Sequence, residues 1–157
     1  MDEVTLARII HVLGVIIWGG GIGFLVIILM PRLRSNPTPS LQFQFFLSVA
    51  RPFAAWMRYV SLAVGLSGFA MLHFLSGWDR YLDFTTYWWV HLMTATWLVY
   101  SALLLRQFIN TRRKCTPQLD DAAATFRLHK VSRMQRNLFI LTVITAASAL
   151  YGVHGSW

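Results

Sequence analysis

This chain has few charged residues, and acidic residues are rarer than basic ones, with 6 Asp and Glu against 14 Lys and Arg. Only 13% of its 157 residues are charged and 6 are acidic, whereas 56% are hydrophobic; an ordinary soluble domain has roughly 25% charged and 45–50% apolar residues. None of the 6 acids falls within an apolar run, so no buried carboxylate is expected to serve as general base or proton relay. The shortage of charge therefore indicates a membrane protein and disfavours hydrolytic chemistry.

Cysteine is almost absent as well. The single Cys115 lies in a basic stretch, and one cysteine excludes an intrachain disulfide and the paired cysteines of zinc-finger and redox motifs. The chemistry of the protein is therefore expected to depend on other side chains.

Long hydrophobic runs, in contrast, fill most of the chain. A transmembrane helix needs roughly 20 consecutive apolar residues, and the four segments that offer them are residues 4–30, 52–76, 85–108 and about 137–155. A lipid environment requires every backbone amide to be bonded within the protein, and the segments lack the alternating pattern of a barrel. We therefore predict an all-α fold: a single transmembrane four-helix bundle, residues 1–157, with up-down topology.

Two longer polar connections join these spans, residues 31–51 and 109–136. The first contains LQFQFFLSVA, a pattern that predicts a short amphipathic helix lying in the membrane interface. The second contains DDAAATFRLHK, in which acids precede bases, as favours a helix dipole. We expect the fourth helix to extend into this connection.

The basic residues are divided very unevenly between the two sides of the bundle. Cytoplasmic loops retain Lys and Arg; of the 14 basic residues, twelve flank the two longer connections, and only Arg8 and Arg80 lie on the other side. Both connections are therefore predicted to be cytoplasmic and both termini to lie on the outer side. The high net charge is then a topology signal, and no nucleic-acid partner is expected.

Each predicted span carries one histidine in its outer half: His11, His73, His91 and His154. At 1.5 Å of rise per residue, His11 and His91 lie roughly 10 Å inside the outer ends of their spans. Ionisable groups at this depth are costly, face the bundle interior and are candidates for function. The fifth histidine, His129, lies in a cytoplasmic connection and is expected to be solvated.

Facing imidazoles in a helix bundle are typical axial ligands of haem iron. In an up-down bundle the first and third spans lie on one diagonal, so His11 and His91 are the predicted axial pair. His73 and His154 form a shallower second pair. The depths differ too little for two haems stacked along the membrane normal, and we predict one haem b near the outer face.

Other residues near His11 are candidates to contact the haem. Gly14 and Trp18 follow it by three and seven residues and share its helix face, where glycine leaves a slot for a flat ligand. Arg8 and Arg80, the two outer bases, are placed to pair with haem propionates.

Two alternatives stay open from the residues alone. Copper suits imidazole and thioether ligands, and Met71 with His73 and His91 with Met93 form suggestive pairs, although residues two apart on a helix point to opposite sides. The other alternative is a non-catalytic membrane subunit or assembly factor whose histidines only pack.

The motifs IHVLGVIIWGGG, WWVHLMTATWLVYSALLL and LTVITAASALYGVHG resemble the copper-resistance D-like (CopD) integral membrane proteins, and more distantly the four-helix HemJ-type proteins. The resemblance implies association with b-type haem or copper in the inner membrane of bacteria, with motif histidines at His11, His91 and His154. The HemJ pattern has a lysine after the third-span histidine, where this sequence reads HLM.

The predicted function is electron transfer through one haem b, between the quinone pool or membrane and an extracytoplasmic redox partner. The chain would act as an oxidoreductase or as a subunit of a larger membrane complex.

Overall fold

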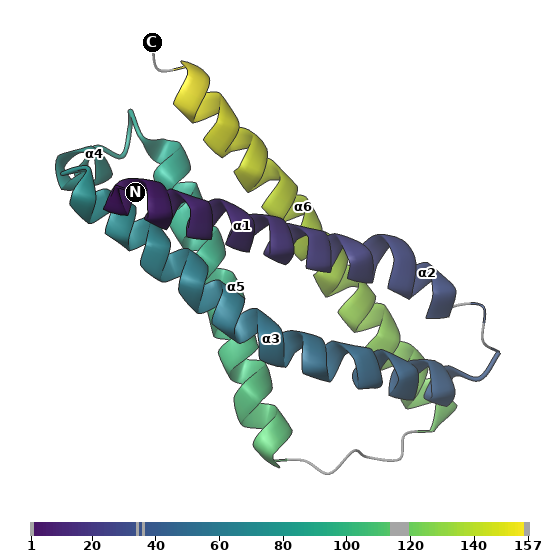
Figure 1. Ribbon diagram of the computed structural model, residues 1–157. Helices are drawn as coiled ribbons and strands as arrows, with labels where there is room; N and C mark the ends of the chain where they lie inside the picture. Colours follow the sequence, from purple (N-terminus) through teal and green to yellow (C-terminus); the bar gives the residue numbers. More distant parts are fainter. Residues whose placement is uncertain (1, 34, 36, 114–119, 156–157) are drawn as a thin grey trace.

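The computed structural model describes residues 2–33, 35, 37–113 and 120–155, and every element of secondary structure in this part of the chain is a helix (Figure 1). In chain order the elements are α1 (Glu3–Gly23), the π-helix η1 (Phe24–Leu29), α2 (Met30–Leu33), α3 (Pro39–Phe74), α4 (Trp78–Leu82), α5 (Trp88–Arg113) and α6 (Asp121–Gly155). The predicted all-α class is confirmed for these residues.

Among the described residues, three helices are long and apolar enough to cross a membrane: Glu3–Leu33, Pro39–Phe74 and Trp88–Ile109. In the most apolar 18-residue stretch of each helix, only 33%, 28% and 11% is buried within the protein. Large apolar surfaces are therefore left for lipid to cover. The fourth predicted span, residues 137–155, is helical and lies within α6, which is not one of the three. Its crossing of the membrane stays a prediction.

The first helical rod runs from α1 through η1 into α2 without interruption. A π-helix has a wider turn than an α-helix, so side chains spaced by four residues stay on one side of it. Leu25, Leu29 and Leu33 have this spacing and are 2%, 6% and 5% exposed. The rod therefore presents a continuous apolar stripe to the rest of the protein.

α3 corrects the prediction of a separate interfacial helix between residues 31 and 51. It is a single helix of 36 residues, about 54 Å long at 1.5 Å per residue, whereas the hydrocarbon core is roughly 30 Å thick. Phe46 and Ala50 pack in a buried cluster with Leu25 and Leu29. Part of the apolar surface of this segment thus packs against the first rod, and the segment is not a separate helix.

Two prolines mark α3, and both are compatible with a helix. Pro39 occupies its first turn, where the missing N–H would have no partner in any case. Pro52 lies inside the helix, a position that membrane helices tolerate because neighbouring groups satisfy the freed carbonyl.

α5 and α6 begin at different points from the predicted spans. α5 starts at Trp88, three residues later than predicted, because Asp83 closes a turn on the backbone of Thr85 and Thr86. α6 begins at Asp121 and continues to Gly155, which confirms that the fourth helix extends into the second connection.

Consecutive long helices run in roughly opposite directions (Figure 1). α3 contacts α1, α5 and α6, and α6 also contacts α1 and α5. The start of α1, the short α4 and the last turn of α6 lie toward one end of the molecule, which we call the α4 end (Figure 1). At the opposite end, called the Pro39 end, the backbone N–H of Ser40 donates to Asp121 Oδ1 at 3.0 Å.

The core consists of two clusters along the long axis. The cluster nearer the Pro39 end contains Leu25, Leu29, Met30, Leu33, Phe46 and Ala50. The other cluster contains Trp18, Ile22, Val64 and Tyr100 and includes an edge-to-face contact between the Trp18 and Tyr100 rings, whose centroids are 4.6 Å apart. Beyond this second cluster, toward the α4 end, the packing involves histidines.

Candidate functional site

His11 is half-buried on α1 and its ring faces α3. Its Nδ1 lies 3.0 Å from the carbonyl oxygen of Val64 and 3.4 Å from Ser67 Oγ. Gly68 leaves room for the ring, because a Cβ at that position would lie 3.3 Å from His11 Cε1. The Val64 carbonyl, the Ser67 hydroxyl and the space at Gly68 therefore position this imidazole against α3.

The hydrogen bond to Val64 determines the tautomer of His11. A carbonyl oxygen can only accept, so Nδ1 carries the proton and, in the neutral ring, Nε2 carries the lone pair. Ser67 Oγ donates to the Ala63 and Val64 carbonyls, which holds the hydroxyl beside the ring. Metal-binding histidines usually donate their second ring N–H in this way, which orients the ring and fixes the tautomer.

His91 lies in the first turns of α5 and contacts different neighbours. Its ring stacks on Phe84 with centroids 3.9 Å apart and planes inclined by 11°, and the Tyr81 ring lies 4.7 Å away. Its Nε2 is buried without a hydrogen-bond partner, the one such side-chain atom found among the described residues.

The segment that covers His91 is held by Asp83. The Asp83 carboxylate accepts hydrogen bonds from the backbone N–H groups of Thr85 and Thr86 and from the Thr85 hydroxyl, at 3.2, 3.1 and 2.8 Å. The Thr86 side chain contributes most to stabilising the ionised form, followed by the Thr86 N–H and the Thr85 hydroxyl, and together they lower the pKa of Asp83 to about 2. The turn therefore keeps Phe84 against the imidazole over the ordinary pH range.

An unpartnered buried nitrogen is unfavourable, because burial removes its hydrogen bond to water without a replacement. In His91 the unpartnered atom is Nε2, and in His11 the Nε2 lone pair is left over once Nδ1 has bonded to Val64. Each ring thus has an Nε2 atom that no hydrogen bond recorded here occupies, and Nε2 is a nitrogen through which imidazole binds metal or haem iron.

Among the described side chains, no hydrogen bond or ring contact joins His11 to His91, and none joins His73 to another of the four outer histidines. His11 bonds to α3, while His91 stacks on residues around α4. His73 is exposed at the end of α3, beside the ring of Phe74. The backbone of His154 lies in the last turn of α6, but its side chain is outside the described ones.

The remaining predicted contacts are distributed along α1 and α4. Gly14 packs against the side chain of Val64, Trp18 belongs to the second core cluster, and Arg8 is exposed. The side chain of Arg80 lies outside the described ones. The part of the chain that the structure describes also contains no group of three His, Cys, Asp or Glu residues that could hold a metal ion.

Sequence reasoning missed the polar contacts between α3, α5 and α6, of which one is buried and three are partly buried. Their members are hydroxyl and indole groups, in the pairs Ser61–Ser101, Thr96–Thr145, Tyr100–Thr142 and Trp97–Ser61. The signal was their helical spacing, since Thr96 and Tyr100 are four residues apart and share a helix face.

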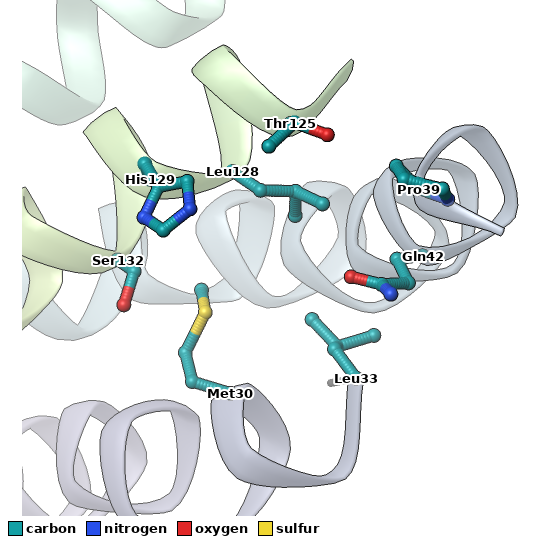
Figure 2. A pocket seen from close by; sticks show the side chains of 8 residues that line it. All are labelled: Met30, Leu33, Pro39, Gln42, Thr125, Leu128, His129 and Ser132. Atoms are coloured by element: carbon teal, nitrogen blue, oxygen red, sulfur yellow. The ribbon is translucent and has the colours of Figure 1, made fainter. Parts of the chain in front are cut away.

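A cavity that is separate from the histidines described above lies at the Pro39 end (Figure 2). It is a cavity of about 160 Å³, lined by Met30, Leu33, Pro39, Gln42, Thr125, Leu128, His129 and Ser132. His129 is exposed there, in line with its expected solvation, and the cavity joins α2, α3 and α6 without any of the four outer histidines.

Fold and site together define a helical membrane protein with two half-buried imidazoles toward one end. No family model, curated protein or solved structure matches this chain, so the CopD-like resemblance stays an expectation.

Proposed function

We propose that this protein is a b-type cytochrome-like membrane protein that holds one haem b through His11 and His91. The proposal includes a fourth span in α6, both termini on the outer side and the inner membrane of a bacterium as its location. Its role would be electron transfer between the quinone pool or membrane and an extracytoplasmic redox partner, alone or within a larger complex.

The observation that carries the proposal is the buried, unpartnered Nε2 of His91. Its neighbours in space are the rings of Phe84 and Tyr81, which offer an apolar environment and supply no hydrogen bond to this atom. An imidazole nitrogen that carries a lone pair in such surroundings can bind iron without displacing a hydrogen-bond partner.

His11 supports the proposal through its fixed tautomer. The Val64 carbonyl accepts from Nδ1, which increases the basicity of Nε2 and limits rotation of the ring. A bound haem would supply a one-electron redox centre, and the role of the chain is to position the two nitrogens and to exclude water.

The first experiment is a reduced-minus-oxidised absorption spectrum of the protein purified in detergent after expression with ample haem precursor. We expect a Soret band and an α band, and we expect His11→Ala and His91→Ala each to abolish them. His129→Ala is the matched control, because this exposed histidine lies at the Pro39 end, and it should retain both bands.

Metal analysis of the same sample distinguishes the alternatives. Stoichiometric copper without haem bands would overturn the haem proposal in favour of copper transport or resistance. A stable protein with neither cofactor would overturn it in favour of a non-catalytic subunit or assembly factor.

A further inference from the structure

A groove with two arginines lies between α3 and α5, on the side of the molecule toward the Pro39 end. Its volume is about 230 Å³, and its lining consists of Arg51, Ala54, Ala55, Arg58, Leu104, Gln107 and Phe108. None of these residues belongs to the proposed haem site, so a ligand in the groove does not depend on the proposed function.

The groove arises where the two helices separate. Nearer the α4 end α3 and α5 are joined closely: Trp97 Nε1 donates to the Ser61 carbonyl at 2.8 Å, and the hydroxyls of Ser61 and Ser101 are 2.9 Å apart. Toward the Pro39 end α5 diverges from α3 (Figure 1). The small side chains of Ala54 and Ala55 do not fill the space between the two helices.

The charged residues that line the groove are both positive. Arg51 and Arg58 are seven residues apart on α3, about 10 Å along its axis and on the same face. The seven lining residues include no acid.

The chemistry of Arg58 suits an anion. Its Cζ lies 4.3 Å from the centroid of the Phe108 ring, a cation–π contact that holds the guanidinium beside the groove lining. The N–H donors of a guanidinium form a planar fork, the geometry that binds phosphate oxygens in pairs.

We propose that this groove binds the phosphate headgroup of an anionic phospholipid. The arginines would contact the phosphate, while Leu104 and Phe108, which lie within the apolar stretch Trp88–Ile109, would contact the glycerol and the first part of the acyl chains. Basic pockets between transmembrane helices bind such headgroups. A soluble phosphate compound would gain nothing from the apolar part of the lining.

The test uses the full chain in a neutral detergent, titrated with phosphatidylglycerol or phosphatidylcholine and followed by native mass spectrometry. We expect phosphatidylglycerol to bind at least tenfold more tightly than phosphatidylcholine. The double variant Arg51→Gln/Arg58→Gln should reduce this preference to less than threefold.

The matched control is Arg127→Gln/Arg133→Gln, which removes the same charge from two exposed residues of α6 outside the groove. It should keep the tenfold preference. An equal loss in the control, or an unchanged preference in the groove variant, would overturn the proposal.

Two further measurements address folding and the source of the phosphate. Ala54→Leu keeps both arginines but fills the groove, and it should lower the preference even if the double arginine variant folds poorly; an unchanged preference would count against the site. Inorganic phosphate and glycerophosphoglycerol are the soluble probes: if either competes with phosphatidylglycerol at an equal concentration, the ligand is a soluble phosphate and the lipid proposal is wrong.

Discussion

At the Pro39 end the first rod and α3 meet through aliphatic and phenyl side chains, whereas nearer the α4 end the helices meet through hydrogen bonds and stacked rings. Leu25, Leu29 and Phe46 pack at the Pro39 end with no polar atom among them. Toward the α4 end His11 bonds to Val64 and His91 stacks on Phe84.

The difference separates two tasks of the bundle. Close apolar packing is non-directional and sensitive to volume, so it holds helices together without orienting any one group. Hydrogen bonds and ring stacks are directional, and they orient the two imidazoles. The following predictions test whether stability and orientation divide between the two regions in this way.

The largest effect is expected at the Pro39 end. Leu25 is 2% exposed, and Leu25→Ala should lower the free energy of unfolding by about 2–5 kcal/mol because it removes packed methyl groups and leaves a cavity. The measurement is unfolding by sodium dodecyl sulfate in mixed micelles, monitored by circular dichroism.

Ile27→Ala is the control for this change, since Ile27 lies on the same π-helical segment and is 63% exposed. It should change the free energy of unfolding by less than about 0.5 kcal/mol. Similar losses in the two variants would mean that the buried stripe does not carry the stability of this end.

A smaller effect is expected from the polar contacts between α5 and α6. Thr145 Oγ1 donates to the Leu141 carbonyl, so Thr96 donates in the 2.8 Å contact between the two hydroxyls. Thr96→Val should destabilise the protein by about 0.6 kcal/mol, the average for such bonds in membranes. Thr94→Val, which removes only a bond to the Val90 carbonyl of its own helix, is the control in the same unfolding assay.

A loss above about 2 kcal/mol for Thr96→Val would contradict the comparison, because the polar contact would then match the apolar core in strength.

The smallest effect is a pH dependence at the α4 end. The folded-state pKa of Asp83 is about 2, below its ordinary value of 3.8, so its stabilising contribution is fully present above about pH 4 and is lost as the pH falls toward 2. The backbone amide resonances of Thr85 and Thr86 should titrate with a midpoint near pH 2 in an NMR experiment in micelles. Asp83→Ala should abolish this titration.

Asp79→Ala is the control, because Asp79 lies in the neighbouring α4 but makes none of the three bonds to Thr85 and Thr86. A titration midpoint near pH 4 in the unmodified chain would show that the turn does not stabilise the carboxylate.

The histidine positions illustrate what could be predicted about the candidate site. Counting residues at a constant helical rise predicted that His11 and His91 occupy the same end of the bundle, and both lie in the helix halves toward the α4 end. Their partners could not be predicted, since Val64 is 53 residues from His11 along the chain. Phe84 is closer to His91 in sequence, but the stack depends on the turn that Asp83 closes.

The error in the first connection has a similar cause. Residues 39–51 have an amphipathic pattern, and that pattern suits both a helix on a membrane surface and a helix packed on another helix. Only the buried contacts of Phe46 and Ala50 with the first rod distinguish the two arrangements.

The sequence by itself determined that the described chain is helical and rich in apolar segments, because hydropathy and backbone hydrogen bonding depend on near neighbours. It predicted four spans, and three of the described helices are long and apolar enough to cross a membrane. The tertiary structure alone decided that α3 continues through Pro52, that His11 bonds to Val64, and that the Nε2 of His91 is buried without a partner. These features depend on residues that become neighbours only when the helices pack, and the same packing opens the arginine groove where α5 diverges from α3.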